Sequence, residues 1–104
     1  VDANKRQLDG YVEDICRGFD LAKKFEAFGL AAFEADGRDC GAIHGALTKA
    51  RDCGRPSAVI LDTEKGQGCC FAETVAFNHY MNISPGMAEE ACREVDRRLR
   101  EGER

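Results

Sequence analysis

The sequence predicts an α/β fold, a partial parallel sheet with crossover helices. Residues 30–35 and 57–61 are short and mostly apolar, which is typical of strands buried on both faces. Helical patterns with one apolar face occupy residues 20–28 and 39–53. Apolar strands separated by helices indicate parallel strands with right-handed crossovers. Residues 1–4 resemble the tail of a further strand.

Capping residues define where the predicted helices begin. Asp20 and Asp39 precede the first two helices, and Ser84 followed by Pro85 precedes a third. Oxygens of such side chains accept hydrogen bonds from free N–H groups of the first turn, and proline suits that turn. Gly29 is a suitable end for the first helix. The third helix has an apolar stripe formed by Ala88, Ala91, Cys92, Val95 and Leu99.

The composition is that of a small soluble domain. The chain has 104 residues, of which 43% are apolar and 33% charged, and its net charge is -4. The acidic excess argues against nucleic-acid binding, which needs clustered Lys and Arg. No apolar run is long enough to cross a bilayer, and no secretion signal is present. The six cysteines lack a Cys-x-x-Cys pair, so we expect free thiols in the cytoplasm rather than disulfides or zinc.

Three segments follow the predicted strands, at residues 4–10, 36–39 and 63–68. Ligands bind at the carboxyl ends of strands in open parallel sheets, so we expect any site at this edge. Asn4 has a side-chain oxygen suited to Mg²⁺ or Ca²⁺, although an Asn at a strand end is often only a turn residue. Asp2, two residues earlier, is expected to face the other way.

Two further groups lie near this edge in the sequence. Lys65, Gly66 and Gly68 form a short loop that could approach a phosphate, although the residues alone favour a flexible connection. His79 follows in an irregular stretch, where it could donate to a phosphate or shuttle a proton. A purely structural role is the alternative for His79.

Five sequence blocks in order resemble those of the transketolase family. The first resembles the end of the family's thiamine diphosphate motif, which opens with Gly-Asp-Gly and closes with Asp-x-Asn. The resemblance runs from end to end and is closest to enzymes that are split into two subunits. The blocks are VDANKRQLDG (1–10), FEAFG (25–29), EADGRD with AI (34–39, 42–43), LDTEKGQG (61–68) and NH (78–79).

The resemblance implies that residues 1–104 form the C-terminal portion of a diphosphate-binding domain. It implies that the side chain of Asn4 and the backbone carbonyl of Arg6 bind Mg²⁺, or Ca²⁺ in its place. His79 would contact the diphosphate and reach toward the sugar, as the catalytic residue of this chain. The cofactor-binding set implied in this way is Asn4, Lys65, Gly66, Gly68 and His79.

The implied activity is transfer of a two-carbon ketol unit between sugar phosphates, with thiamine diphosphate and Mg²⁺, in the pentose phosphate pathway. A partner subunit would supply the pyrimidine-binding domain, in a dimer or heterotetramer. The family's Gly-Asp-Gly would lie before residue 1, so we expect a fragment that is inactive alone. The alternatives are a non-catalytic α/β interaction module and a piece of another thiamine diphosphate enzyme, such as deoxyxylulose-phosphate synthase.

Overall fold

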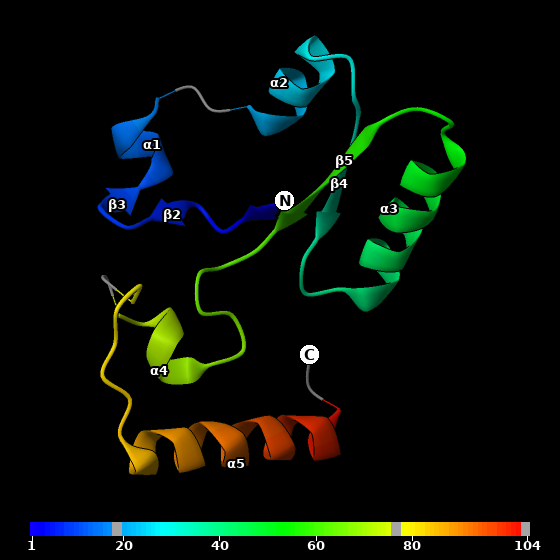
Figure 1. Ribbon diagram of the computed structural model, residues 1–104. Coiled ribbons are helices and arrows are strands. Elements are labelled where there is room, and N and C mark those ends of the chain that lie inside the picture. Colours follow the sequence, from blue (N-terminus) through cyan, green and yellow to red (C-terminus); the bar gives the residue numbers. More distant parts are fainter. Residues whose placement is uncertain (18–19, 76–77, 103–104) are drawn as a thin grey trace.

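A three-stranded parallel sheet is the centre of the molecule, as the sequence predicts (Figure 1). The computed structural model describes residues 1–17, 20–75 and 78–102. The sheet has the order β1-β5-β4, in which β1 is Asp2–Ala3, β4 is Ala31–Asp36 and β5 is Ser57–Asp62. Both strand pairs are parallel.

The register places the carboxyl ends of the three strands at one level. Ala3 and Asp36 both lie opposite Asp62, the last residue of the central strand. The N–H of Leu61 donates to the carbonyl of Val1 at 2.9 Å, which ties the short β1 to β5. The segments that follow the three strands therefore start side by side, and the predicted common edge is confirmed.

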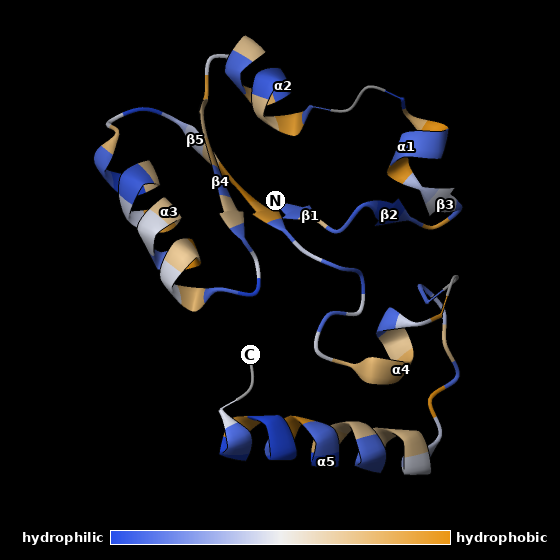
Figure 2. Ribbon diagram, turned by 180° about the vertical axis from the view of Figure 1, so that it is seen from behind, coloured by the Kyte–Doolittle hydropathy of each residue, from blue (hydrophilic) through white to orange (hydrophobic). Residues whose placement is uncertain are grey.

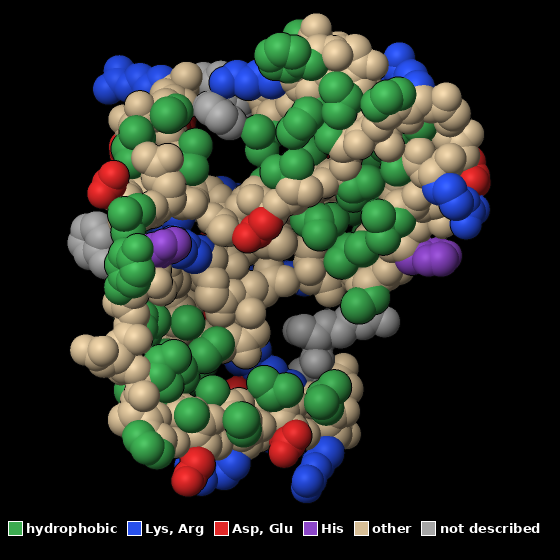
Figure 3. Space-filling view, in the orientation of Figure 1, with side chains coloured by type: hydrophobic (Ala, Val, Ile, Leu, Met, Phe, Trp, Pro, Cys, Tyr) green, Lys and Arg blue, Asp and Glu red, His purple; other side chains and the backbone are tan. Residues whose placement is uncertain are grey.

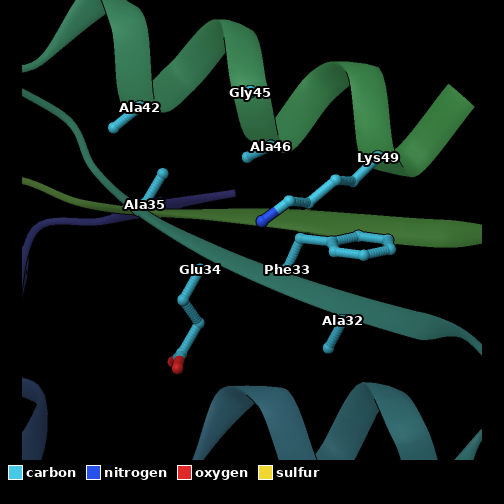
Figure 4. A pocket seen from close by; sticks show the side chains of 8 residues that line it. All are labelled: Ala32, Phe33, Glu34, Ala35, Ala42, Gly45, Ala46 and Lys49. Atoms are coloured by element: carbon cyan, nitrogen blue, oxygen red, sulfur yellow. The ribbon is translucent and has the colours of Figure 1, made fainter.

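The two predicted crossover helices cover opposite faces of the sheet. In Figure 4 β4 lies between α3 (Cys40–Asp52) and α2 (Leu21–Ala27); Ala35 points toward Ala42 of α3, and Glu34 points the other way. Asp20 caps α2 by accepting from the N–H of Lys23 at 2.9 Å. Asp39 caps α3 by accepting from the N–H of Gly41 at 2.7 Å.

The structure also contains short elements that the sequence pattern did not reveal. Strands β2 (Arg6–Gln7) and β3 (Gly10–Tyr11) form an antiparallel hairpin, and α1 (Val12–Ile15) follows it directly. Helix α4 (Cys70–Glu73) lies in the stretch expected to be irregular or briefly helical. Strands of two residues are too short to show the alternation by which strands are recognised.

Helix α5 (Pro85–Glu101) begins as predicted, but its apolar stripe is not buried. Ser84 accepts from the N–H of Met87 at 3.3 Å, and Gly102 ends the helix at a φ of 68°. Val95 is 44% exposed and Leu99 is 75% exposed. Apolar and polar residues separate onto two sides of the helix, which lies beyond α4 and away from the sheet (Figure 2).

The hydrophobic core of the described residues is small and is made mainly of alanine. Its buried members are Ala31, Ala46, Ala58 and Ile60. Apolar side chains are visible on the surface over the sheet and its helices and along α5 (Figure 3). The radius of gyration is 16.5 Å, whereas a compact domain of this length has about 13 Å. Flat packing of this kind leaves large apolar side chains in contact with solvent.

The structure describes the state of the cysteines and the length and hydropathy of the helices. All six cysteines are free thiols. Among the described helices none is long and apolar enough to span a bilayer.

Gly37 provides a test of how tightly the carboxyl edge is packed. A Cβ at Gly37 would overlap the methyl group of Thr63 and lie 2.9 Å from the carbonyl oxygen of Asp62. We expect Gly37→Ala to lower the free energy of unfolding by about 1–3 kcal/mol, measured by denaturant titration of the complete protein.

Gly45→Ala is the matched control, because Gly45 lies within α3 and its Cβ would meet no atom within 4 Å. It is expected to stabilise the protein by about 0.5–1 kcal/mol, since alanine favours a helix over glycine. Equal stability of the two variants would contradict the close approach at Gly37.

Candidate functional site at the carboxyl edge of the sheet

Backbone and side-chain hydrogen bonds join the loops at this edge. The N–H of Gly37 donates to the carbonyl of Asp62 at 2.8 Å, so the loop after β4 is tied to the end of β5. The side-chain amide of Gln67 donates to the carbonyl of Gly37 at 3.0 Å. The loop after β5 is thereby bonded to the loop after β4.

Asp2 connects the end of β1 to the loop after β5. Its Oδ2 accepts from the side-chain nitrogen of Asn4 at 2.8 Å, and its Oδ1 accepts from the hydroxyl of Thr63. The bonds from Thr63 and Asn4, helped by the charge of Lys65, lower the pKa of Asp2 below its ordinary value. The carboxylate of Asp2 therefore stays ionised at neutral pH.

The contact between Asp2 and Asn4 corrects the expectation that these side chains face opposite ways. Residues two apart in an extended segment lie on the same side, because the side-chain period of a strand is two. The sequence therefore contained the signal that places Asp2 in the site. Thr63 carried no such signal, because its position beside Asp2 depends on the pairing of β1 with β5.

Ion pairs hold the N-terminal segment against the loop after β5. Lys5 has a left-handed backbone with a φ of 64°. Its Nζ lies 2.9 Å from Oδ1 of Asp62 and 2.9 Å from Oε1 of Glu64. These side chains are between 46% and 70% exposed, so each pair contributes little energy.

The side chain of Arg6 fastens the hairpin to the end of α4. Its Nη1 donates to the carbonyl of Val75 at 3.3 Å, and its Nη2 donates to the hydroxyl of Tyr11 at 2.9 Å. The guanidinium carbon also lies 4.7 Å from the centre of the Tyr11 ring. The guanidinium of Arg6 thus packs on Tyr11 and joins the hairpin to the segment after α4.

Lys65, in the loop after β5, lies beside His79. The Nζ of Lys65 is 3.4 Å from Nδ1 of His79. The side-chain amide of Asn78 donates to the carbonyls of Lys65 and Ala72, at 3.2 and 2.6 Å, and so holds the segment before His79 against the loop. Asn4 is thus hydrogen-bonded to the loop after β5 through Asp2 and Thr63, and the same loop carries Lys65, which lies beside His79.

Glycines allow the loop after β5 to turn tightly. Gly66 and Gly68 have φ values of 84° and 88°, a region that residues with a Cβ rarely adopt. A Cβ at Gly66 would lie 2.8 Å from the carbonyl carbon of Ala72, whereas one at Gly68 would meet nothing within 4 Å. The N–H of Gly68 donates to the carboxylate of Glu73 at 2.9 Å. Gly66 is needed for packing on α4 as well as for its backbone angle.

The oxygen donors at this edge fit a hard divalent cation in type. Among the described residues the side-chain oxygen of Asn4 accepts one bond, from the N–H of Arg6 at 3.1 Å, and an amide oxygen has two lone pairs. Amide and carbonyl oxygens are ligands that Mg²⁺ and Ca²⁺ prefer. No group of three His, Cys, Asp or Glu side chains among the described residues could hold a metal. The described residues therefore offer oxygen donors of a suitable type but no such cluster of ligand side chains.

A groove beside β4 lies away from these residues. It is lined by β4 and α3, mostly by small side chains, and none of the predicted site residues contributes to it (Figure 4). The predicted site residues therefore lie at the carboxyl edge and not in the groove.

Comparison with curated proteins identifies the family. The chain is 34% identical over 98 residues, 93% of its length, to 6-deoxy-6-sulfo-D-fructose transketolase subunit SqwG of Clostridium sp. (strain MSTE9). It is 40% identical over 72 residues, 69% of its length, to an apulose-4-phosphate transketolase subunit of Actinobacillus succinogenes. The chain is a member of the transketolase family.

A third transketolase-family protein, y4mO of Sinorhizobium fredii, is 35% identical over 98 residues, 92% of this chain. The matched regions span 36%, 26% and 35% of the three relatives, so this transketolase-family chain covers about a third of their length or less. Two of these relatives are named as subunits. No protein-family model matches the chain, and no solved structure matches it.

The two loop glycines give a paired test of this geometry. Gly66→Ala and Gly68→Ala both place a Cβ on a left-handed backbone, but only the first also clashes with α4. We expect amide hydrogen exchange in residues 64–73 of the complete protein to accelerate more in Gly66→Ala, because the loop must separate from α4. The difference should correspond to about 1–3 kcal/mol of local opening free energy. Equal protection in both variants would contradict the contact with Ala72.

Proposed function

We propose that this chain forms part of the thiamine diphosphate and Mg²⁺ site of a transketolase that transfers a two-carbon ketol unit between sugar phosphates. The observation that supports this most is that Asn4, at one edge of a parallel sheet, is joined by hydrogen bonds to the loop that carries Lys65, which lies beside His79. The names of the relatives favour transketolase over other enzymes that use this cofactor.

In this proposal the oxygen of Asn4 and the backbone carbonyl of Arg6 bind the Mg²⁺ that holds the diphosphate. The cofactor, when bound, supplies the electron sink that ketol transfer requires. Lys65, Gly66 and Gly68 line the diphosphate side of the pocket. His79 is exposed in this structure, and Lys65 lies beside it, so both side chains are accessible to an anionic group. His79 contacts the diphosphate and moves a proton at the sugar.

The rest of the site comes from outside this chain in the same proposal. A partner subunit supplies the pyrimidine-binding domain, as the subunit names of two relatives suggest for those proteins. The enzyme is then a dimer or heterotetramer of the cytoplasm, where the free thiols stay reduced. Its place in carbohydrate metabolism follows from the sugar phosphates that it uses.

The roles of Asn4 and His79 can be separated in the complete enzyme. We expect Asn4→Ala to raise the Mg²⁺ concentration for half-maximal cofactor binding by about 10-fold or more, because it removes a ligand. His79→Ala should change this concentration less and should lower the rate of ketol transfer by about 100-fold or more. Cofactor titration followed by calorimetry, beside a coupled transfer assay, measures both quantities. The reverse order of the two effects on Mg²⁺ would contradict the assignment.

The isolated chain provides a second test. Because its described residues offer no such cluster of ligand side chains, we expect the 104 residues alone to bind thiamine diphosphate with Mg²⁺ weakly or not at all. Calorimetry that gave a Kd of about 1 μM or lower would contradict this expectation. The complete enzyme serves as the positive control under the same conditions.

A further inference from the structure

We infer that Asp2 is a positioning residue, which holds the side-chain amide of Asn4 so that its oxygen is turned toward a divalent cation. The inference rests on the proposed function, in which that oxygen is a metal ligand. Each oxygen of Asp2 accepts a hydrogen bond from a neighbouring side chain, and the inference assigns Asp2 to Asn4 and not to the cation.

The nitrogen and the oxygen of the Asn4 amide differ chemically, and each has a partner that can form a hydrogen bond with that atom but not with the other. A carboxylate can only accept hydrogen bonds, so Asp2 selects the nitrogen of Asn4. The N–H of Arg6 can only donate, so it selects the oxygen. A flipped amide would place oxygen against the carboxylate and N–H groups against the N–H of Arg6. Two independent partners therefore select the same orientation.

The position of Asp2 is in turn determined by the loop after β5. Asp2 lies opposite Leu61 in the parallel ladder, and Thr63 follows two residues later. The hydroxyl of Thr63 donates to Oδ1 of Asp2, which leaves Oδ2 for Asn4. The orientation of Asn4 is thus transmitted from β5 through Thr63 and Asp2 rather than set by Asn4 alone.

Removal of the carboxylate should leave the amide free to rotate. In the complete enzyme we expect Asp2→Ala to raise the Mg²⁺ concentration for half-maximal thiamine diphosphate binding by about 10-fold, as for other residues that orient a metal ligand. Asp2→Asn should recover part of this loss, since its oxygen can still accept from Asn4. Thr63→Val, which retains Asp2 but removes its anchor, should shift the concentration in the same direction by a smaller factor. Calorimetric titration at several Mg²⁺ concentrations measures all three.

Glu90→Ala is the matched control, because it removes one negative charge from an exposed position on α5. It should leave the Mg²⁺ requirement unchanged. A thermal melt of each variant without metal shows whether the fold is retained. If Asp2→Ala does not fold, the role of Asp2 is tested by comparing Thr63→Val with the wild type. An unchanged Mg²⁺ requirement in Thr63→Val would overturn the inference.

A double variant separates positioning from a general structural effect. If Asp2 acts through Asn4, adding Asp2→Ala to Asn4→Ala should raise the Mg²⁺ requirement by less than about 2-fold further. A further loss as large as in the wild-type background would overturn the inference. If Asn4→Ala raises the Mg²⁺ requirement and Asp2→Ala does not, the inference about Asp2 is overturned and the proposed function is kept. An unchanged Mg²⁺ requirement in Asn4→Ala would overturn the proposed function, and the inference with it.

Discussion

The parallel pairing of β5 with a strand on each side is the constraint on which the rest of the structure depends. It brings the last residues of the three strands, Ala3, Asp62 and Asp36, to one level. The loops that follow are consequently close enough to bond to one another, and Gly37 is close enough to β5 to exclude a Cβ. Without this register the chemically useful side chains, which are far apart in the sequence, would not meet.

The longer elements could be predicted because their signals are local. Asp20, Asp39 and Ser84 cap helices that begin at the next residue, and the apolar runs become β4 and β5. The hairpin and α1 were missed, and α4 was expected only as a brief helix in an irregular stretch, because elements of two or four residues have no period to detect. For α5 the apolar face was predicted correctly, but an amphipathic pattern does not state what covers that face.

The sequence indicated at which edge of the sheet the candidate site lies, but not the hydrogen bonds and ion pairs that join its residues. The ends of the strands and the family resemblance pointed to Asn4, Lys65 and His79 without any knowledge of contacts. The link between Asp2 and Thr63 spans 61 positions in the sequence and follows from strand register, which sequence patterns do not provide. The same holds for Lys5, whose ion pairs depend on an unusual left-handed backbone at the end of β1.

The flat shape of the molecule, 16 Å along its shortest axis, has a thermodynamic consequence for the site. With so few buried side chains, the ordered arrangement of the loops is supported by little internal packing. A surface that covers the exposed apolar side chains stabilises the ordered state by mass action. An anion or cation held by the ordered loops stabilises the same state. Where both events occur, reciprocity requires that each strengthens the other by an equal factor, so the two share one coupling free energy.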